Sequence, residues 1–256
     1  PYRQLHYPFE NKDKFDASFP YDFIGEGLDQ TRGWFYTLVV LGTHLFGKAP
    51  FRNLICNGLV LAADGKKMSK RLKNYPEPGL IFDQHGADAL RLYLINSPVV
   101  RADPLKFRED GVKDVVKDVL LPWLNSYRFL EGQIAESDFK FDVSKLESVV
   151  NVMDRWILAS LQTLLKTVRA EMAAYRLYAV LPPCLRFLES LTNMYIRFNR
   201  RRLKGETGTS EEDPTVPLTV LFHVLLNFSL VMAPFAPLLS ENIYQRLRGS
   251  IKTNSD

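Results

Sequence analysis

Apolar residues recur at helical spacing from Val112 to residue 205, and this pattern limits the fold of that region to packed helices. Residues 112–133 carry a broad apolar face, and Asp110 stands near its start as a helix cap. A second helix is expected to open at Asp154. Its apolar positions follow one another by steps of three or four: Ile157, Leu161, Leu164, Val168, Met172 and Tyr175. We expect Pro182 and Pro183 to end this helix, because proline has no amide hydrogen to donate.

The steps of three and four resume after the two prolines. They predict a helix with a buried stripe, and Gly205 stands where a C-terminal cap belongs. The stripe consists of Cys184, Leu188, Leu191, Tyr195 and Phe198. We expect Trp123 and Trp156 to lie in the core of a bundle of about four or five helices rather than to stack on bases.

Residues 216–239 form an almost continuous apolar stretch, which raises the question of a membrane span. The stretch contains His223, Asn227 and three prolines. Such residues are expensive or disruptive in a lipid-exposed helix. A buried bundle helix is therefore the favoured interpretation, and we expect no membrane partner.

Strand and turn signals appear only in the first hundred residues. Residues 1–25 read as irregular chain that ends in a short strand near Tyr21–Gly25, and residues 31–45 read as a buried helix. Residues 54–62 suit a covered parallel strand that ends at the turn Asp64-Gly65, and residues 80–95 suit a helix with a break at Gly86. We therefore predict an α/β domain at 1–105, with too few strands to be whole, followed by an all-α domain at 106–256.

The composition is that of a folded chain: 46% of the residues are hydrophobic and 24% are charged. The two cysteines, Cys56 and Cys184, are too far apart in sequence for a metal knuckle, so we expect no structural zinc. The first residue is Pro1 rather than Met, with no signal peptide nearby, which suggests a piece of a longer protein. The net charge is +4, and residues 154–205 hold ten basic side chains against three acidic ones.

A short basic cluster, Asp64-Gly65-Lys66-Lys67-Met68-Ser69-Lys70-Arg71, follows the expected strand. Ammonium groups on a loop that leaves a sheet suit the charge that develops on a pyrophosphate leaving group. The Ser69 hydroxyl can donate to the same oxygens. The alternative is a solvated basic loop or a nuclear localisation patch, and composition alone favours that alternative.

A second cluster joins the expected strand to the helix after it: Glu26-Gly27-Leu28-Asp29-Gln30-Thr31-Arg32-Gly33-Trp34-Phe35. Carboxylates and a carboxamide at a helix N-terminus suit ribose hydroxyls or an amine, and the glycines allow a ligand to approach the backbone. The alternative is structural: Asp29 caps the helix and Trp34 belongs to the core.

Together the two clusters resemble the class I aminoacyl-tRNA synthetases, whose Lys-Met-Ser-Lys-Ser loop is similar to Lys67–Arg71. The string Glu-Gly-x-Asp-Gln-x-Arg-Gly-Trp-Phe resembles the isoleucyl-tRNA synthetase family in particular. Arg71 in place of the final Ser is similar to the eukaryotic cytosolic branch, so a cytoplasmic location is expected. Further strings match in the family's order: His6–Asn11, Ala87–Tyr93, Asp154–Leu158 and Arg200–Lys204.

The resemblance implies that ATP, as its Mg²⁺ complex, and isoleucine form isoleucyl-adenylate, and that the acyl group then passes to tRNA(Ile). It implies that Lys67, Ser69 and Lys70 hold the triphosphate, with Lys70 acting on the transition state. The adenylate would contact Glu26, Gly27, Asp29 and Gln30, while Trp34 would form a wall of the isoleucine pocket.

The basic segment that ends the helix before Gly205 would grip the tRNA backbone. It comprises Arg197, Arg200, Arg201, Arg202 and Lys204. Favourable interaction with the helix dipole explains one or two such charges but not five. In the full-length protein, membership of a multi-synthetase complex is a further expectation.

The sequence also departs from the family, because no His-x-Gly-His string surrounds any of its four histidines, at positions 6, 44, 85 and 223. The chain therefore resembles the C-terminal half of a catalytic domain joined to an anticodon-binding bundle, without the editing domain. We expect the isolated chain to be inactive. The competing hypothesis is a stand-alone tRNA-binding or scaffold module without catalysis.

Overall fold

A computed structural model describes residues 4–69, 71–135, 139–147, 149–206, 213 and 215–249 of the chain. The chain divides into two compact units. Unit 1 comprises residues 1–68 and 98–106, and unit 2 comprises residues 69–97 and 107–256. The predicted boundary at 105/106 stays a prediction, and the compact units divide the chain differently because residues 69–97 pack with the helical part.

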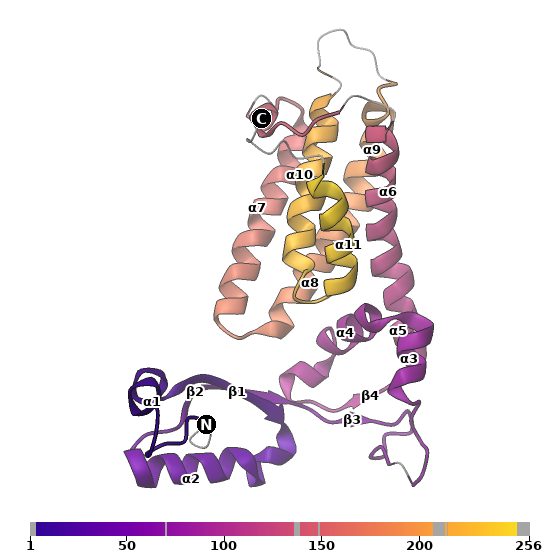
Figure 1. Cartoon of the computed structure of the whole chain (residues 1–256). Coiled ribbons are helices and arrows are strands. Elements are labelled where there is room, and N and C mark those ends of the chain that lie inside the picture. The colour runs from indigo at the N-terminus through magenta and orange to yellow at the C-terminus, as the bar shows by residue number, and fades with distance from the viewer. Residues whose placement is uncertain are drawn as a thin grey trace. The chain divides into compact units, whose positions relative to one another are not determined.

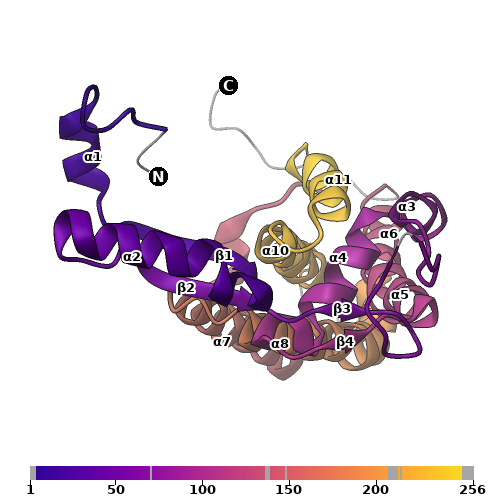
Figure 2. The ribbon, with the colours of Figure 1, turned by 90° about the horizontal axis from the view of Figure 1, so that it is seen from below.

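Unit 1 is built around two parallel strands, β1 (Tyr21–Gly27) and β2 (Phe51–Asn57), which pair in register from Tyr21↔Phe51 to Gly27↔Asn57. Parallel strands need a crossover, and the crossover contains helix α2 (Trp34–Phe46), which lies along the strand pair in Figure 2. Ile24 of β1 packs there against two residues of α2, Phe35 and Leu38.

The predicted strand near Tyr21–Gly25 is confirmed, whereas the predicted single strand at residues 54–62 is wrong. The structure has β2, then Gly58, and then the short strand β3 (Val60–Leu61), which pairs in parallel with β4 (Leu105–Lys106). A Cβ atom on Gly58 would lie 1.8 Å from the Asp103 carbonyl oxygen. This close approach breaks the apolar run into two strands of different sheets.

The expectation of irregular chain before β1 was also incomplete, because α1 (Lys12–Ser18) forms there. Its buried residue Phe15 packs on the rings of Tyr7, Phe19 and Phe46, with centroid distances of 4.3, 4.9 and 5.1 Å. An aromatic cluster of this kind stabilises a short helix that propensity alone does not predict.

Unit 2 is helical (Figure 1). Its helices are α3 (Pro78–His85), α4 (Ala87–Ile95), α5 (Glu109–Val115), α6 (Leu121–Ala135), α7 (Val152–Ala173), α8 (Leu177–Glu189), α9 (Arg197–Leu203), α10 (Thr215–Met232) and α11 (Pro237–Arg248). Two π-helical segments, Val116–Leu120 and Ser190–Ile196, make α5–α6 and α8–α9 continuous rods. Short 3₁₀ segments occupy Leu28–Arg32 and Pro98–Arg101 in unit 1 and Val143–Leu146 in unit 2.

The bundle core confirms most positions of the predicted helical stripes, but Met172 and Tyr175, which were predicted on the second stripe, are 39% and 40% exposed. Trp123 and Ile157 are fully buried, and Trp156 is half-buried against the same core. Helix α10 is long and apolar enough to cross a membrane by length and composition alone, yet 72% of it is buried inside the bundle. It ends at Met232, so the apolar stretch 216–239 is two helices rather than one.

Two predicted boundaries can be compared directly with the structure. The break at Gly86 is confirmed, since Gly86 separates α3 from α4 with φ = +82°. The helix end at Pro182-Pro183 is wrong: α7 ends at Ala173, and both prolines lie inside α8. Tyr175 has a left-handed backbone, with φ = +56°, and reverses the chain before the prolines are reached.

Asp110 lies in the first turn of α5 and does not cap it, because Arg108 occupies the cap position and no side chain caps it.

Candidate functional site

The segment Glu26–Trp34 lies at the carboxyl end of β1, where parallel sheets bind their ligands. Glu26 and Gly27 are the last residues of the strand, opposite Cys56 and Asn57 of β2. The chain then enters the 3₁₀ turn that contains Asp29 and Gln30. The Glu26 and Asp29 side chains are exposed, so both carboxylates can reach a ligand at this edge.

A chain of hydrogen bonds fixes this turn. The Gln30 amide donates from Nε2 to Asp29 Oδ2 over 3.0 Å, and Gln30 Oε1 accepts from the backbone N–H of Trp34 over 3.1 Å. Gln30, and not Asp29, therefore satisfies the N-terminus of α2, and the carboxylate of Asp29 is oriented by its neighbour. The structural alternative for Asp29, a helix cap, is wrong.

Two glycines leave room for these side chains. A Cβ atom on Gly27 would lie 2.7 Å from Asp29 Oδ1, and a Cβ atom on Gly33 would lie 2.8 Å from Gln30 Oε1. Any larger residue at either position would displace the side-chain oxygen beside it.

Trp34 is the first residue of α2, and 44% of its surface is exposed. The next residue, Phe35, is buried and supplies the core contact instead. The core interpretation of Trp34 is therefore wrong, and its indole is accessible as a wall for an apolar ligand.

The basic cluster begins with a tight hairpin in unit 1. The predicted turn is confirmed: the Gly65 N–H donates to the Ala62 carbonyl over 2.8 Å, and the Ala62 N–H donates to the Lys66 carbonyl over 2.9 Å. Gly65 has φ = +83°, which glycine adopts without strain. Asp64 accepts from the Lys66 backbone N–H and forms an exposed ion pair with the Lys66 ammonium group.

The three residues expected to hold the triphosphate do not all belong to one compact unit. Lys67 forms an antiparallel bridge with Leu61 and belongs to unit 1. Ser69 belongs to unit 2, where its N–H donates to Asn74 Oδ1 over 3.0 Å and its carbonyl accepts from Leu72 and Lys73. Lys70 lies outside the described residues.

The basic segment expected to grip RNA lies on α9 and the residue after it. Arg197 and Arg201 are exposed and form no ion pair with any described residue. The Arg200 guanidinium lies 5.7 Å from the centroid of the Phe129 ring, within the range of a cation–π contact. Lys204 pairs with Glu206 over 3.3 Å.

Arg202 differs from the other four residues, because its guanidinium points inward. Its Nη1 and Nη2 donate to the two carboxylate oxygens of Asp154 over 2.9 and 2.6 Å, and the Tyr195 hydroxyl donates to the same carboxylate over 2.6 Å. Asp154 is fully buried. The sequence expectation of a phosphate contact overlooked this internal partner, and we assign Arg202 to the bundle's interior.

Phe198 was expected on the buried stripe of this helix, and that prediction is wrong. The side chain is 70% exposed, between the exposed residues Arg197 and Arg201 in sequence, whereas Asn199 is buried. Sequence reasoning thus missed an exposed aromatic residue inside the basic segment. The signal was present, since Arg197 precedes Phe198 and Arg200 follows it two positions later.

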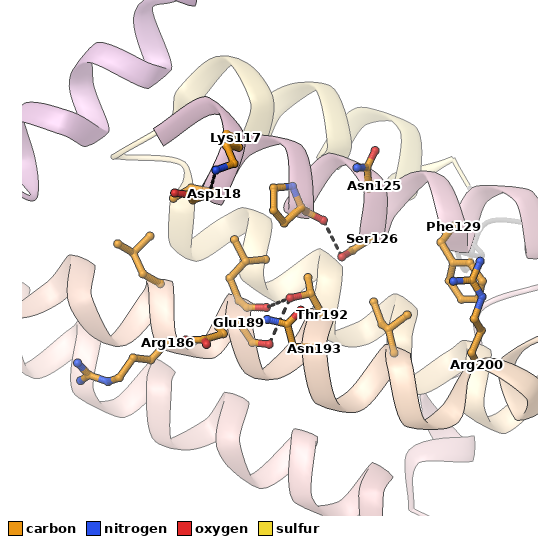
Figure 3. A pocket seen from close by; sticks show the side chains of 15 residues that line it. Lys117, Asp118, Asn125, Ser126, Phe129, Arg186, Glu189, Thr192, Asn193 and Arg200 are labelled. Carbon is orange, nitrogen blue, oxygen red and sulfur yellow. Dashed lines mark hydrogen bonds and ion pairs between the residues drawn. The ribbon is translucent and has the colours of Figure 1, made fainter. Parts of the chain in front are cut away.

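A groove of about 750 Å³ runs between the two rods that contain the π-helical segments (Figure 3). Asn125 lies on the α5–α6 side and Asn193 on the α8–α9 side, and neither side-chain amide bonds to another described residue. The pair Phe129 and Arg200 also lines the groove. Amide groups, an arginine and an aromatic ring are the groups that recognise unstacked bases.

Comparison with known proteins identifies the family. The family described as tRNA synthetases class I (I, L, M and V) matches residues 1–106, and the anticodon-binding domain of tRNA ligase matches residues 154–255. The cytoplasmic isoleucine–tRNA ligase of Saccharomyces cerevisiae is 60% identical over 254 residues, which cover 97% of this chain. The chain belongs to the class I aminoacyl-tRNA synthetases of the isoleucyl type. It spans 23% of the length of the yeast relative.

Solved synthetase structures share the fold of this class I chain. A Mycobacterium tuberculosis methionyl-tRNA synthetase in complex with methionyl-adenylate superposes with a TM-score of 0.76 at 19% identity, covering 94% of this chain and 47% of that one. The LeuRS–tRNA–LeuAMS ternary complex of Agrobacterium radiobacter gives 0.67 at 22% identity, covering 96% and 30%. The expected fold, part of a class I catalytic domain followed by a helical anticodon-binding domain, is confirmed. The expected cytoplasmic location agrees with the name of the yeast relative.

The described part of this synthetase chain contains no group of three or more histidine, cysteine or acidic residues that could hold a metal ion. Cys56 and Cys184 are both free thiols. Burial raises the pKa of the Cys184 thiol to about 12, so this cysteine is a protonated core residue at neutral pH.

Proposed function

We propose that this chain forms the part of an isoleucine–tRNA ligase that binds the adenylate and triphosphate and grips the tRNA. The observation that carries the proposal is the ordered Asp29–Gln30–Trp34 turn at the carboxyl end of β1, on the same chain as the basic cluster Asp64–Arg71, which we call the lysine loop. The same two segments are the ones that resemble the isoleucyl family.

In the proposed activation step, a carboxylate oxygen of isoleucine attacks the α-phosphorus of ATP. The bond from that phosphorus to the β-phosphate bridging oxygen breaks, and pyrophosphate leaves with its Mg²⁺. Lys67, Ser69 and Lys70 would stabilise the negative charge that accumulates on the leaving group. The protein forms no covalent bond to the substrate in this step, so it would act by positioning the reactants and by placing fixed cations and hydrogen-bond donors around the developing charge.

The residues at the carboxyl end of β1 would hold the nucleoside side of the adenylate. Glu26 and Asp29 offer carboxylate acceptors to the ribose hydroxyls, and Gly27 lets the ligand approach the backbone. Gln30 would act by orienting Asp29. The exposed indole of Trp34 would cover the apolar side chain of isoleucine.

In the second proposed step, a ribose hydroxyl at the end of tRNA(Ile) attacks the isoleucyl carbonyl and displaces AMP. The bundle would hold the tRNA through Arg197, Arg200, Arg201 and Lys204, and Phe198 would stack on an unpaired base beside them. The groove that contains Asn125 and Asn193 adds hydrogen-bonding groups to this surface.

The isolated chain is expected to show no isoleucine-dependent exchange of pyrophosphate into ATP. The sequence contains no His-x-Gly-His string, which the class I reaction requires. The measurement is exchange of labelled pyrophosphate with the 256-residue chain. The positive control is a chimera in which this chain replaces the matching stretch of the yeast isoleucine–tRNA ligase. Robust exchange by the isolated chain would refute the expected inactivity, and an inactive but folded chimera would refute the proposed function.

Reversing the three arginines Arg197, Arg200 and Arg201 to Glu is expected to weaken tRNA(Ile) binding and flatten its salt dependence. Each lost phosphate contact removes about 0.7 from the slope of log K against log salt, so the slope should fall by about 2. The measurement is tRNA binding to the 256-residue chain at several salt concentrations. A matched control reverses Arg155, Lys166 and Arg169, which are exposed on α7 and change the net charge equally.

Phe198→Ala provides the complementary variant in the same assay. It removes a stacking surface and no charge, so tRNA binding should weaken while the salt slope stays unchanged.

The two charge-reversal variants, on α9 and on α7, are compared in the same way. An equal loss of tRNA binding in both would show that net charge, and not the α9 surface, attracts the RNA.

A further inference from the structure

Helix α4 grips the turn between α10 and α11 through two charged side chains that lie one helical turn apart. Asp88 accepts from the backbone N–H groups of Leu238 and Leu239, over 3.3 and 2.7 Å. Arg91 donates from Nε to the Phe235 carbonyl over 3.2 Å and from Nη2 to the Pro234 carbonyl over 2.8 Å. We call Asp88 and Arg91 the α4 clamp.

The α4 clamp bonds to backbone carbonyls of the turn and to N–H groups at the start of α11. Helix α11 has Ala236 at its cap position, with no side chain to accept from its first amides. Asp88 takes that role from a different helix, and it is 6% exposed. A carboxylate at this end of a helix is also favoured by the helix dipole.

All four hydrogen bonds of the clamp go to the main chain, two to carbonyls of the turn and two to N–H groups of the first residues of α11. The grip therefore does not depend on which side chains the turn carries, and each bond is strengthened by a charged partner. The clamp joins segments more than 140 positions apart in sequence.

The α4 clamp acts on a segment that is connected in sequence to unit 1 on both sides. The chain leaves unit 1 after Met68 and enters it again at Pro98. Residues 69–97, which contain α3 and α4, are therefore joined covalently to unit 1 at both ends. The same segment begins with Ser69 of the lysine loop. Helices α10 and α11 have no such tether on this segment, and the clamp supplies a noncovalent one.

We propose that Asp88 and Arg91 are positioning residues that hold the RNA-binding bundle to the segment that begins with the second half of the lysine loop. The inference rests on the proposed function. Activation needs only the adenylate site, whereas transfer needs the adenylate and the bundle-bound tRNA to be held at the same time. Loosening the clamp therefore slows transfer selectively, because misplacing a reacting group by about 1 Å is enough to cost one hundredfold in rate.

The test compares Asp88→Asn and Arg91→Lys in the yeast chimera. The control is Asp83→Asn, an exposed acidic residue of the neighbouring helix α3. We expect single-turnover transfer to tRNA(Ile) to fall about tenfold or more, while tRNA-free pyrophosphate exchange and the Kd for tRNA stay within about twofold. Thermal unfolding confirms that each variant is folded, and the milder Arg91→Lys serves if Asp88→Asn is not.

Two outcomes would overturn the inference: an unchanged transfer rate in both variants, or an equal fall in exchange, tRNA binding and transfer, which marks a purely structural role. Failure of the proposed function gives a different result, because the unsubstituted chimera would then lack isoleucine-dependent exchange.

Discussion

Asp154→Ala is expected to destabilise the helical bundle by about 3–5 kcal/mol, because it removes one partner from a buried ion pair. The Asp154 carboxylate accepts three hydrogen bonds, two from Arg202 and one from Tyr195. Removing it takes away the two hydrogen bonds that the Arg202 guanidinium donates, in a side chain that is only 12% exposed, and the one that the buried Tyr195 hydroxyl donates. Urea unfolding of the 256-residue chain, followed by circular dichroism, measures the loss.

Two further variants distinguish the effect of breaking a buried ion pair from the effect of removing any acidic side chain. Asp118→Ala breaks an exposed pair with Lys117 and is expected to cost less than about 1 kcal/mol. Replacing both partners, as Asp154→Leu with Arg202→Met, removes both charges of the pair and should recover part of the stability. A loss below about 1 kcal/mol for Asp154→Ala would show that water reaches the guanidinium and screens it.

Helical periodicity predicted the bundle core well and failed where the helix itself changes geometry. The stripe Leu188, Leu191 and Tyr195 is buried as expected. It continues through Asn199 and not through Phe198, because the π-helical segment Ser190–Ile196 adds residues to each turn and shifts the phase of the next helical residues. No pattern of apolar residues announces a π-helical segment. The exposed aromatic residue of the basic segment was therefore assigned to the core.

The two adjacent prolines gave a wrong helix boundary for a related reason. Pro182 and Pro183 lack the amides that would bond to carbonyls four residues earlier, and that property predicts a helix end. It does not show where the helix that contains the prolines begins. The chain reverses at Tyr175, so the prolines fall in the middle of α8, where burial of Val180, Leu181 and Cys184 stabilises the helix around them.

At the candidate active site, residue types were predicted and their bonding was not. The sequence placed Asp29, Gln30 and Trp34 at a strand-to-helix junction, and the structure agrees. That Gln30 rather than Asp29 bonds to the helix amide depends on the positions of single oxygen atoms. The inward turn of Arg202 likewise depends on Asp154, which lies 48 residues away in sequence. Spacing along one helix contains no information about such a partner.

Lys70→Ala in the yeast chimera is expected to lower the rate of isoleucine-dependent pyrophosphate exchange by about 10²–10³, as the loss of one transition-state donor does elsewhere. The proposed role concerns charge that develops on the leaving pyrophosphate, so the Kd for tRNA should be unchanged. Pyrophosphate exchange measures the first quantity, and tRNA binding by the same preparation measures the second.

A neighbouring lysine provides the matched control for this prediction. Lys66 is exposed and already pairs with Asp64, so Lys66→Ala removes the same charge from the same loop without removing the proposed donor. We expect exchange by Lys66→Ala to stay within about threefold of the unsubstituted chimera, since exposed pairs contribute little. Equal losses in the two variants would mean that the loop acts through its summed charge, and equal losses in exchange and tRNA binding would refute the transition-state role of Lys70.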